Sequence, residues 1–158
     1  MNKNNWKTFV IWIVICNAVG ALSGWLSMEG TELYAKYVQQ PPFSPPSWVF
    51  PVVWTILYTL MGISAARAMT NGQNVPCKTG FLLFVAQLTV NFFWPLIFFN
   101  AQAYGAALVW LLLLWALVLL TILQFRKCDK LSAILLVPYL IWLTFAVYLN
   151  AAVWVINR

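Results

Sequence analysis

The chain has 158 residues, of which 63% are hydrophobic and only 8% are charged, with a net charge of +6. A soluble domain carries about 25% charged residues. This composition, with a mean hydropathy of +0.83, therefore excludes a soluble protein and indicates an integral membrane protein. Because the apolar runs are continuous rather than alternating, we expect an all-α bundle of membrane-spanning helices rather than a barrel of strands.

Five hydrophobic stretches are long enough to cross the roughly 30 Å hydrocarbon layer of a bilayer. They cover about residues 8–26, 47–69, 79–99, 104–125 and 131–156, and only the loop at 27–46 is long. The short later connections favour antiparallel neighbours within a single domain over residues 1–158. The basic start resembles a signal peptide, but no cleavage site lies at a typical depth, so we expect a retained first span.

Prolines punctuate the second and fifth stretches. Residues 41–51 read PPFSPPSWVFP, and each proline fixes its own φ and disfavours helix in the residue before it. The loop at 27–46 is therefore predicted to form a stiff lid over one end of the bundle, extended where the prolines hold it. Ser47 is the candidate cap of the next helix, with Pro51 in its first turn. Pro138 is predicted to kink the fifth span in its second turn.

The distribution of charge predicts the orientation of the bundle. All lysines and arginines except Lys36 and Arg158 fall on the side of the N-terminus, whereas Glu29 and Glu32 lie on the opposite side. Basic loops tend to stay in the cytoplasm. We therefore expect a cytoplasmic N-terminus, with the lid loop and the C-terminus outside. Arg67, near the end of the second span, is expected to reach the lipid headgroups.

The residue inventory excludes several function classes. The chain contains no histidine, and no aspartate, glutamate or lysine lies at mid-depth in a span. Proton-coupled pumps need an intramembrane ionisable group, and hydrolytic enzymes need an acid, base or nucleophile constellation, so both are excluded. Cys16, Cys77 and Cys128 show no paired spacing and predict structural thiols without a disulfide framework or metal site. We also expect no nucleic-acid partner.

Three spans carry polar and aromatic residues at helical spacing, each set on one face. The faces are Gln87, Asn91, Trp94 and Phe98; Tyr139, Trp142, Ala146 and Asn150; and Trp54, Tyr58, Met61 and Ala65. If they converge, the bundle holds an aromatic, uncharged cavity that suits a flat hydrophobic ligand with a few polar edges. The alternative is that large aromatic residues simply fill the core, and periodicity alone leaves both interpretations open.

Three long runs resemble one known family. PPFSPPSWVFPVVWTILYTLMG, QLTVNFFWPLIFF and VPYLIWLTFAVYLN resemble the TspO/MBR family of bacterial tryptophan-rich sensory proteins and mitochondrial translocator proteins. The resemblance covers essentially the whole chain. It implies a five-helix bundle, often a homodimer, with a pocket under the first loop for porphyrin- or haem-type tetrapyrroles. It also implies that some members bind sterols or synthetic isoquinoline and benzodiazepine ligands.

The resemblance implies that Trp54 and Trp142 are pocket tryptophans, and it adds the loop-to-helix corner to the three faces. The predicted ligand-binding residues are Tyr34, Pro45, Pro46, Trp48, Trp54, Tyr58, Gln87, Asn91, Trp94, Phe98, Tyr139, Trp142, Ala146 and Asn150. The expected function is a membrane receptor or carrier for protoporphyrin IX or haem with a sensory or regulatory role and no obligatory cofactor. The alternatives are light-dependent porphyrin degradation, with Trp54 and Trp142 as candidate catalytic groups, and passive carriage of sterol, lipid or another apolar metabolite.

The chain departs from the family pattern at several positions. Phe43 replaces a frequent tryptophan, Gln40 replaces a frequent lysine that could meet a propionate, and Trp110 replaces an aspartate, which is expected to make that wall of the pocket apolar. No basic residue follows Tyr139 closely enough for the sterol pattern, which makes sterol transport a poor expectation. Finally, two small-residue pairs can form either a dimer seam or close packing within the bundle: Gly20 with Gly24, and Gly62 with Ala66.

Overall fold

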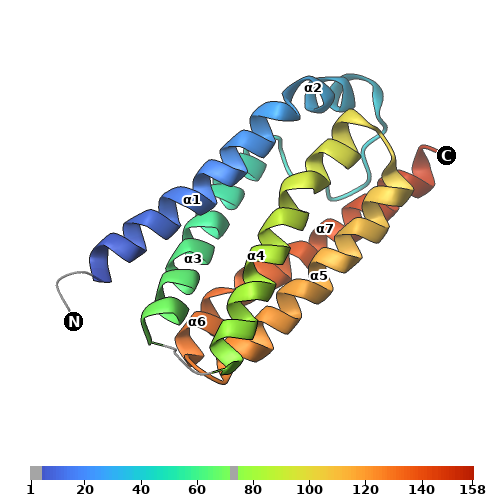
Figure 1. Ribbon diagram of the computed structural model, residues 1–158. Helices are drawn as coiled ribbons and strands as arrows, with labels where there is room; N and C mark the ends of the chain where they lie inside the picture. Colours follow the sequence, from blue (N-terminus) through green and yellow to red (C-terminus); the bar gives the residue numbers. More distant parts are fainter. Residues whose placement is uncertain (1–4, 72–74) are drawn as a thin grey trace.

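The helices of the computed structural model form an elongated bundle, with the described residues being 5–71 and 75–158 (Figure 1). Five helical segments are long and apolar enough to cross a membrane. The elements are α1 (Asn5–Leu26), α2 (Met28–Tyr37), α3 (Val49–Asn71), α4 (Val75–Pro95), a π-helix η1 (Leu96–Asn100), α5 (Tyr104–Arg126), α6 (Lys130–Leu135) and α7 (Val137–Ile156). No strand occurs in the described ranges, and the predicted all-α fold is confirmed.

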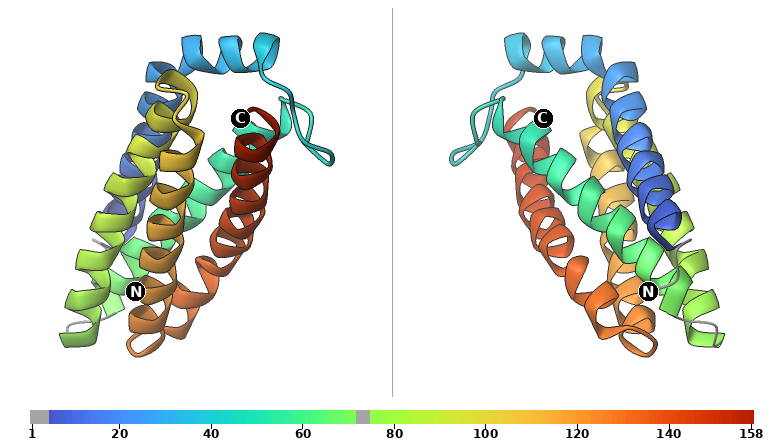
Figure 2. Two further views of the ribbon diagram at one scale, coloured as in Figure 1. Left: turned by 90° about the vertical axis from the view of Figure 1, so that its right-hand side faces the viewer. Right: turned by 90° about the vertical axis from the view of Figure 1, so that its left-hand side faces the viewer.

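The long helices pack as antiparallel neighbours, as the short connections predict. The most extensive contacts are those of α1 with α3, α4 with α5 and α5 with α7. Helix α2 lies across one end of the bundle, and the chain after it descends beside the C-terminal end of α7 (Figure 2). Helix α2 and the chain after it therefore form a roof over this end of the molecule.

The lid loop is only partly extended, and the prediction missed α2. The prolines begin at residue 41, so the preceding segment is free to form a helix, and Glu29 in its first turn and Lys36 in its last suit the helix dipole. Residues 38–48 contain a bend and two turns but no helix, as the prolines predict. The expected cap is wrong: α3 begins at Val49 with Pro51 in its first turn, and no hydrogen bond of Ser47 caps it.

Two spans are interrupted in ways that the sequence analysis did not foresee. Pro138 does not kink a continuous helix. The fifth span instead breaks after Leu135, and α7 starts again at Val137 with the proline in its first turn, where its missing N–H costs no intrahelical bond. The third span passes Pro95 and widens into η1. In both cases the helix changes its geometry next to the proline, and such local adjustments are the usual way in which a span accommodates a proline.

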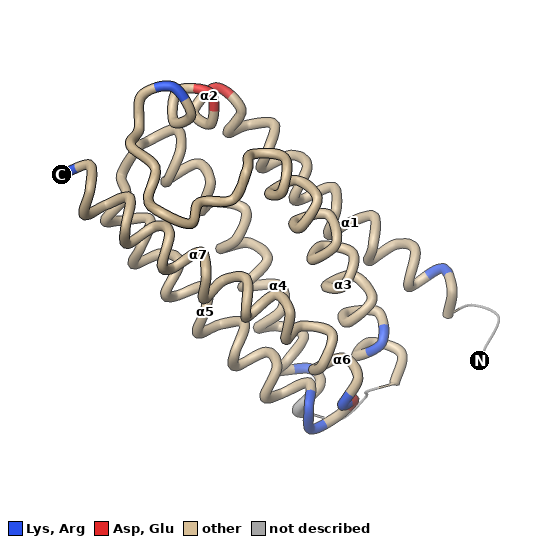
Figure 3. Tube along the Cα trace, turned by 180° about the vertical axis from the view of Figure 1, so that it is seen from behind, with Lys and Arg blue, Asp and Glu red and all other residues tan. Residues whose placement is uncertain are grey.

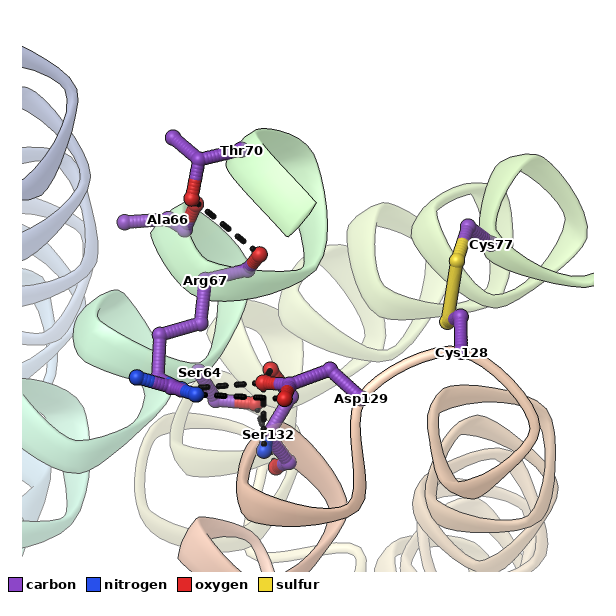
Figure 4. Close-up of polar contacts among 8 residues, drawn as sticks. All are labelled: Ser64, Ala66, Arg67, Thr70, Cys77, Cys128, Asp129 and Ser132. Carbon is purple, nitrogen blue, oxygen red and sulfur yellow. Dashed lines mark hydrogen bonds and ion pairs between the residues drawn. A yellow bond between two sulfur atoms is a disulfide. The ribbon is translucent and has the colours of Figure 1, made fainter. Parts of the chain in front are cut away.

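Cys77 and Cys128 form a disulfide, which contradicts the predicted absence of one. Their Cα atoms are 5.8 Å apart although 51 residues separate them in sequence. The antiparallel pairing of α4 with α5 brings the start of α4 next to the turn after α5 (Figure 4). Sequence spacing carries no information about such a contact. Cys16 is buried and unpaired, in agreement with its predicted packing role.

Arg67, near the end of the second span, pairs with Asp129, a partner that the sequence analysis did not predict (Figure 4). Its Nε and Nη2 atoms donate to the two carboxylate oxygens at 2.9 and 3.1 Å. Asp129 also caps α6, because its Oδ2 accepts from the backbone N and the hydroxyl of Ser132 at 3.1 and 2.6 Å. Burial raises the pKa of Asp129, but these hydrogen bonds and the Arg67 charge outweigh it, and the net pKa is lowered.

The charged residues gather at the two ends of the bundle, as expected from the sequence. Figure 3 shows lysine and arginine positions concentrated at the end that holds α6, and the acidic positions on α2 at the roofed end. The shaft between them carries exposed leucine, isoleucine and valine side chains. The molecule therefore has two polar ends separated by an apolar belt, which is the pattern of a multi-pass membrane protein.

The small-residue pairs are used inside the bundle. A side chain on Gly62 would collide with the α1 backbone at Trp12 and Ile13, and one on Gly20 would collide with the Tyr58 ring. These glycines allow α1 and α3 to approach closely. Of the two sequence-based interpretations, close packing within the bundle is the one that the structure supports for Gly20 and Gly62.

Candidate functional site

A cavity of about 960 Å³ lies beneath the roof of the bundle. Its walls come from the halves of α1, α3 and α7 nearer to α2, from the last turns of α4 and from η1, and its roof comes from α2 and residues 40–47. Ligand pockets for small organic molecules occupy about 300–1,000 Å³. The cavity is therefore large enough for a molecule the size of a macrocycle.

Nine of the described residues that line the cavity are aromatic. On α3, Trp54 lies with its ring centroid 5.6 Å from that of Tyr58, and Phe50 meets Trp142 of α7 edge-to-face at 6.0 Å. On α4, Trp94 stacks on Phe98 with centroids 5.0 Å apart. Rings arranged in this way expose both faces and edges to the interior, and such surfaces bind flat π-systems.

Most of the predicted ligand-binding residues converge on this cavity. Those that line it are Tyr34, Pro45, Pro46, Trp54, Tyr58, Asn91, Trp94, Phe98, Trp142, Ala146 and Asn150. Trp48 does not, because it is 66% exposed at the start of the second span. Gln87 and Tyr139 also lie outside the lining, buried deeper in the bundle. The three helical faces thus meet at the cavity over the part nearer the roof. Away from the roof they fill the core instead, because Met61, Ala65, Gln87 and Tyr139 are buried outside the lining.

A chain of hydrogen bonds between buried side chains lies beneath the floor of the cavity. Asn91 Nδ2 donates to the Tyr139 hydroxyl at 2.9 Å, and that hydroxyl donates to Gln87 Oε1 at 3.1 Å. Gln87 Nε2 approaches the Met61 sulfur at 3.9 Å. Gln87 and Tyr139 therefore hold Asn91 in place from below rather than facing the cavity themselves. Such interhelical bonds in membrane bundles contribute about 0.6–2 kcal/mol each.

Asn150 is engaged at both ends of its amide. Its Oδ1 accepts from the indole N–H of Trp94 at 3.3 Å, and its Nδ2 donates to the carbonyl of Tyr104 at 2.8 Å. The side chain thereby links α7 to α4 and α5. Asn150 borders the cavity, but both ends of its amide form hydrogen bonds with other helices of the bundle.

Helix α1 supplies a wall that the sequence analysis missed. Asn17, Gly20 and Gly24 line the cavity from this helix, and Ser27 lines it from the turn directly after the helix. They recur at i, i+3, i+7 and i+10, which is one helical face. A lipid-facing helix needs no such stripe of small and polar residues, so this spacing was the signal available in the sequence. Phe145 of α7 and Phe99 of η1 also line the cavity without having been predicted.

The roof is tied down at several points. Asn157 exchanges two hydrogen bonds with the backbone N and O of Gln39, both at 3.0 Å, and the Tyr148 hydroxyl donates to the carbonyl of Pro42 at 3.2 Å. On α2, the Tyr34 ring lies 5.5 Å from Phe98. Burial, with a smaller contribution from Tyr104, raises the pKa of Tyr34 to about 12, so this part of the roof carries no charge at neutral pH.

The family-specific departures occupy different places. Gln40 lines the cavity. Phe43 is 85% exposed in a turn with a φ of 64° and lies outside the lining, so its replacement of tryptophan does not alter a cavity wall. The expectation for Trp110 is also wrong: its indole donates to the carbonyl of Val90 at 2.7 Å, between α4 and α5, and it does not border the cavity.

No described residue that lines the cavity is charged, and residues 5–71 and 75–158 contain no cluster suited to a metal ion. The site lacks the paired acid and base groups that proton-transfer catalysis uses. Fold and cavity together define a class: a multi-pass membrane protein that encloses a large, uncharged, aromatic chamber under a tied roof.

The particular family follows from comparison with known proteins. The chain belongs to the TspO/MBR family, whose profile it matches over residues 12–155. It is 37% identical to the tryptophan-rich protein TspO of Chlorobaculum tepidum over 158 residues, which covers 99% of both chains. It is 38% identical to protein CrtK of Rhodobacter capsulatus, covering 94% of this chain and 92% of that one. The human translocator protein is 39% identical over 132 residues, covering 80% and 75% of the two chains.

Proposed function

We propose that this protein binds porphyrin- or haem-type tetrapyrroles in the roofed cavity and takes part in sensing or regulating their level. The observation that carries the proposal is the chamber of about 960 Å³ walled by tryptophan, tyrosine and phenylalanine rings. A tetrapyrrole is a flat, extended π-system, and offset stacking on aromatic side chains is its natural mode of contact. The names of relatives, a tryptophan-rich sensory protein and a translocator protein, are in line with this role.

The hydrogen-bonding groups of the cavity refine the expected contacts. Asn91 and Asn150 are bonded within the bundle, so they position the walls rather than reach for the ligand. Among the described residues, no hydrogen bond engages the indole N–H of Trp54 or Trp142. We therefore propose that these two tryptophans both stack on the ligand and donate to its polar edge. Gln40, on the rim, is the proposed neutral partner of a propionate group.

Titration with protoporphyrin IX tests this proposal through quenching of tryptophan fluorescence. We expect saturable quenching, and at least a roughly tenfold weaker apparent affinity in Trp142→Phe, because the substitution removes the indole donor and part of the stacking surface. Trp154→Phe is the matched control, because Trp154 lies outside the cavity lining. The proposal fails if quenching does not saturate, or if both variants bind like the wild type.

A second candidate function is light-dependent degradation of the bound porphyrin. The observation in its favour is that Trp54 lies close to two phenols, with ring centroids 5.6 Å from Tyr58 and 6.1 Å from Tyr139. Illumination of the porphyrin complex in air separates this function from simple binding. An open-chain product formed by the wild type, and formed more slowly by Trp54→Phe, is expected of an enzyme. Equal loss of porphyrin with and without protein contradicts it.

The proposed arrangement in the membrane places the α6 end in the cytoplasm and the roofed end outside. Its support is the concentration of lysine and arginine at the α6 end (Figure 3). Under this proposal the cavity opens toward the outer half of the bilayer. A homodimer also remains a proposal, and Gly20 and Gly62 are not available for its interface.

A further inference from the structure

We propose that the cavity receives its ligand sideways from the bilayer, through an opening between the outer halves of α1 and α3. The inference rests on the proposed function, because it specifies how the bound molecule reaches the chamber. The class of ligand it implies is a molecule dissolved in the membrane rather than one delivered from water.

Close contacts join the two helices around their midpoints. The α1 backbone at Ile13 lies close to Gly62, and the Asn17 amide donates to the Thr59 hydroxyl at 3.2 Å. On the roof side of these contacts, Gly20 lies close to the Tyr58 ring. Beyond this point α3 leans toward α7, where Phe50 meets Trp142, and Figure 2 shows α1 and α3 separating toward the α2 end.

The cavity reaches the molecular surface where the helices separate. Ala21 and Gly24 on α1, and Pro51 and Thr55 on α3, line the cavity and are also exposed. A side chain built on Gly24 would meet no atom within 4 Å. Exposed residues of the cavity wall also occur in the roof, at Thr31, Ala35, Gln40, Pro46 and Ser47. Those on α1 and α3 differ because they belong to two membrane-spanning helices that separate toward the α2 end (Figure 2).

The surroundings of the opening are apolar. Leu22 and Trp25 on α1, and Val52 and Ile56 on α3, are each about half exposed or more. These four side chains belong to segments long and apolar enough to span the membrane. In a bilayer the opening therefore faces lipid, and a hydrophobic ligand already concentrated there can pass without entering water.

The roof, in contrast to the opening between α1 and α3, is held in place by hydrogen bonds. The segment after α2 is tied to α7 by the paired Gln39–Asn157 hydrogen bonds and by the bond from Tyr148 to Pro42. At the other end of α2, the Asn100 amide donates to the carbonyl of Leu26 at 2.9 Å. Lifting the roof requires these bonds to break, whereas passage between α1 and α3 requires none of them to change.

Stopped-flow measurement of protoporphyrin IX binding in nanodiscs tests the inference. Gly24→Phe places a ring in the open space, and Thr55→Phe narrows the opening from the other side. We expect each variant to slow both association and dissociation by roughly tenfold or more, because a blocked passage adds a barrier in both directions. Leu22→Phe adds the same ring to α1 outside the cavity lining and is the matched control.

A second arm closes the roof instead. Gln39→Cys and Asn157→Cys, joined by a short maleimide cross-linker in a Cys16→Ala background, are expected to keep wild-type association rates. Wild-type rates in Gly24→Phe, or a locked roof that slows association as much as Gly24→Phe does, overturn the inference. Faster dissociation in Gly24→Phe also overturns it, because that result indicates a damaged site rather than a blocked passage. If the wild type does not bind at all, the proposed function itself fails and the inference falls with it.

Discussion

At the scale of single residues, the polar side chains within the membrane are engaged with one another. Asn91 and Asn150 were predicted as ligand contacts from their position on aromatic faces, and both do border the cavity. Their amides, however, join helices to helices. Spacing along a helix identifies which face a residue occupies, but it does not reveal which group will be the hydrogen-bond partner of that residue. That choice depends on the packing of distant segments.

Asp129 is the residue whose loss should be felt most in stability. Asp129→Ala removes the pair with Arg67 and the cap of α6, and we expect a loss of about 2–3 kcal/mol. Asp129→Asn keeps an oxygen for the cap but loses the charge and one of the two acceptors of Arg67, so its cost should be smaller than that of the alanine variant. Thermal unfolding in detergent measures both. Equal stability of the alanine variant and the wild type would show that this contact network is not important to the fold.

The same carboxylate predicts a dependence on pH. Because its pKa is lowered in the folded state, its contribution is present above the ordinary carboxyl pKa of about 3.9 and is lost as the pH falls through the lowered value. We expect the difference in unfolding temperature between wild type and Asp129→Asn to stay constant above about pH 5 and to shrink in stronger acid. A difference that grows on acidification contradicts this assignment.

At the scale of elements, the sequence predicts the spans well and their interruptions poorly. All five long apolar stretches became helices because their length and continuity leave no other way to satisfy the backbone in lipid. Helix α2 was not predicted because its ten residues are too few and too polar to show the continuous apolar run of a membrane span. The break before Pro138 was not predicted because a proline can either kink a helix or lie in the first turn of a new one. Tertiary packing determines which of the two occurs.

The disulfide between Cys77 and Cys128 links α4 covalently to the turn after α5 and is expected to stabilise the fold. Double replacement of Cys77 and Cys128 by serine should lower stability by about 2–4 kcal/mol, in the lower part of that range if the membrane already restrains the unfolded chain. Cys16→Ala is the control for loss of a thiol elsewhere. If the disulfide is present, alkylation after denaturation without reductant labels one cysteine; labelling of all three contradicts it.

At the scale of the whole molecule, the cavity joins features that are separate in the sequence. Stripes on three spans predicted that it exists, and the structure adds the missing wall on α1 and the roof on α2. These additions came from segments without strong aromatic signals, where small residues matter because of the space they leave. The fold was therefore predictable in outline, whereas the shape of the site depended on contacts between distant residues.

The central claim is that the roofed cavity is the binding site for a tetrapyrrole. Filling it directly is the sharpest test: Ala146→Phe projects a ring from a cavity-lining position, and Ile141→Phe adds a ring on the same helix at a position that is 66% exposed and outside the lining. Equilibrium titration with protoporphyrin IX in the dark should show saturable binding by the wild type and Ile141→Phe, and binding weakened by roughly tenfold or more in Ala146→Phe. Equal affinity in all three proteins would place the ligand elsewhere and contradict the account.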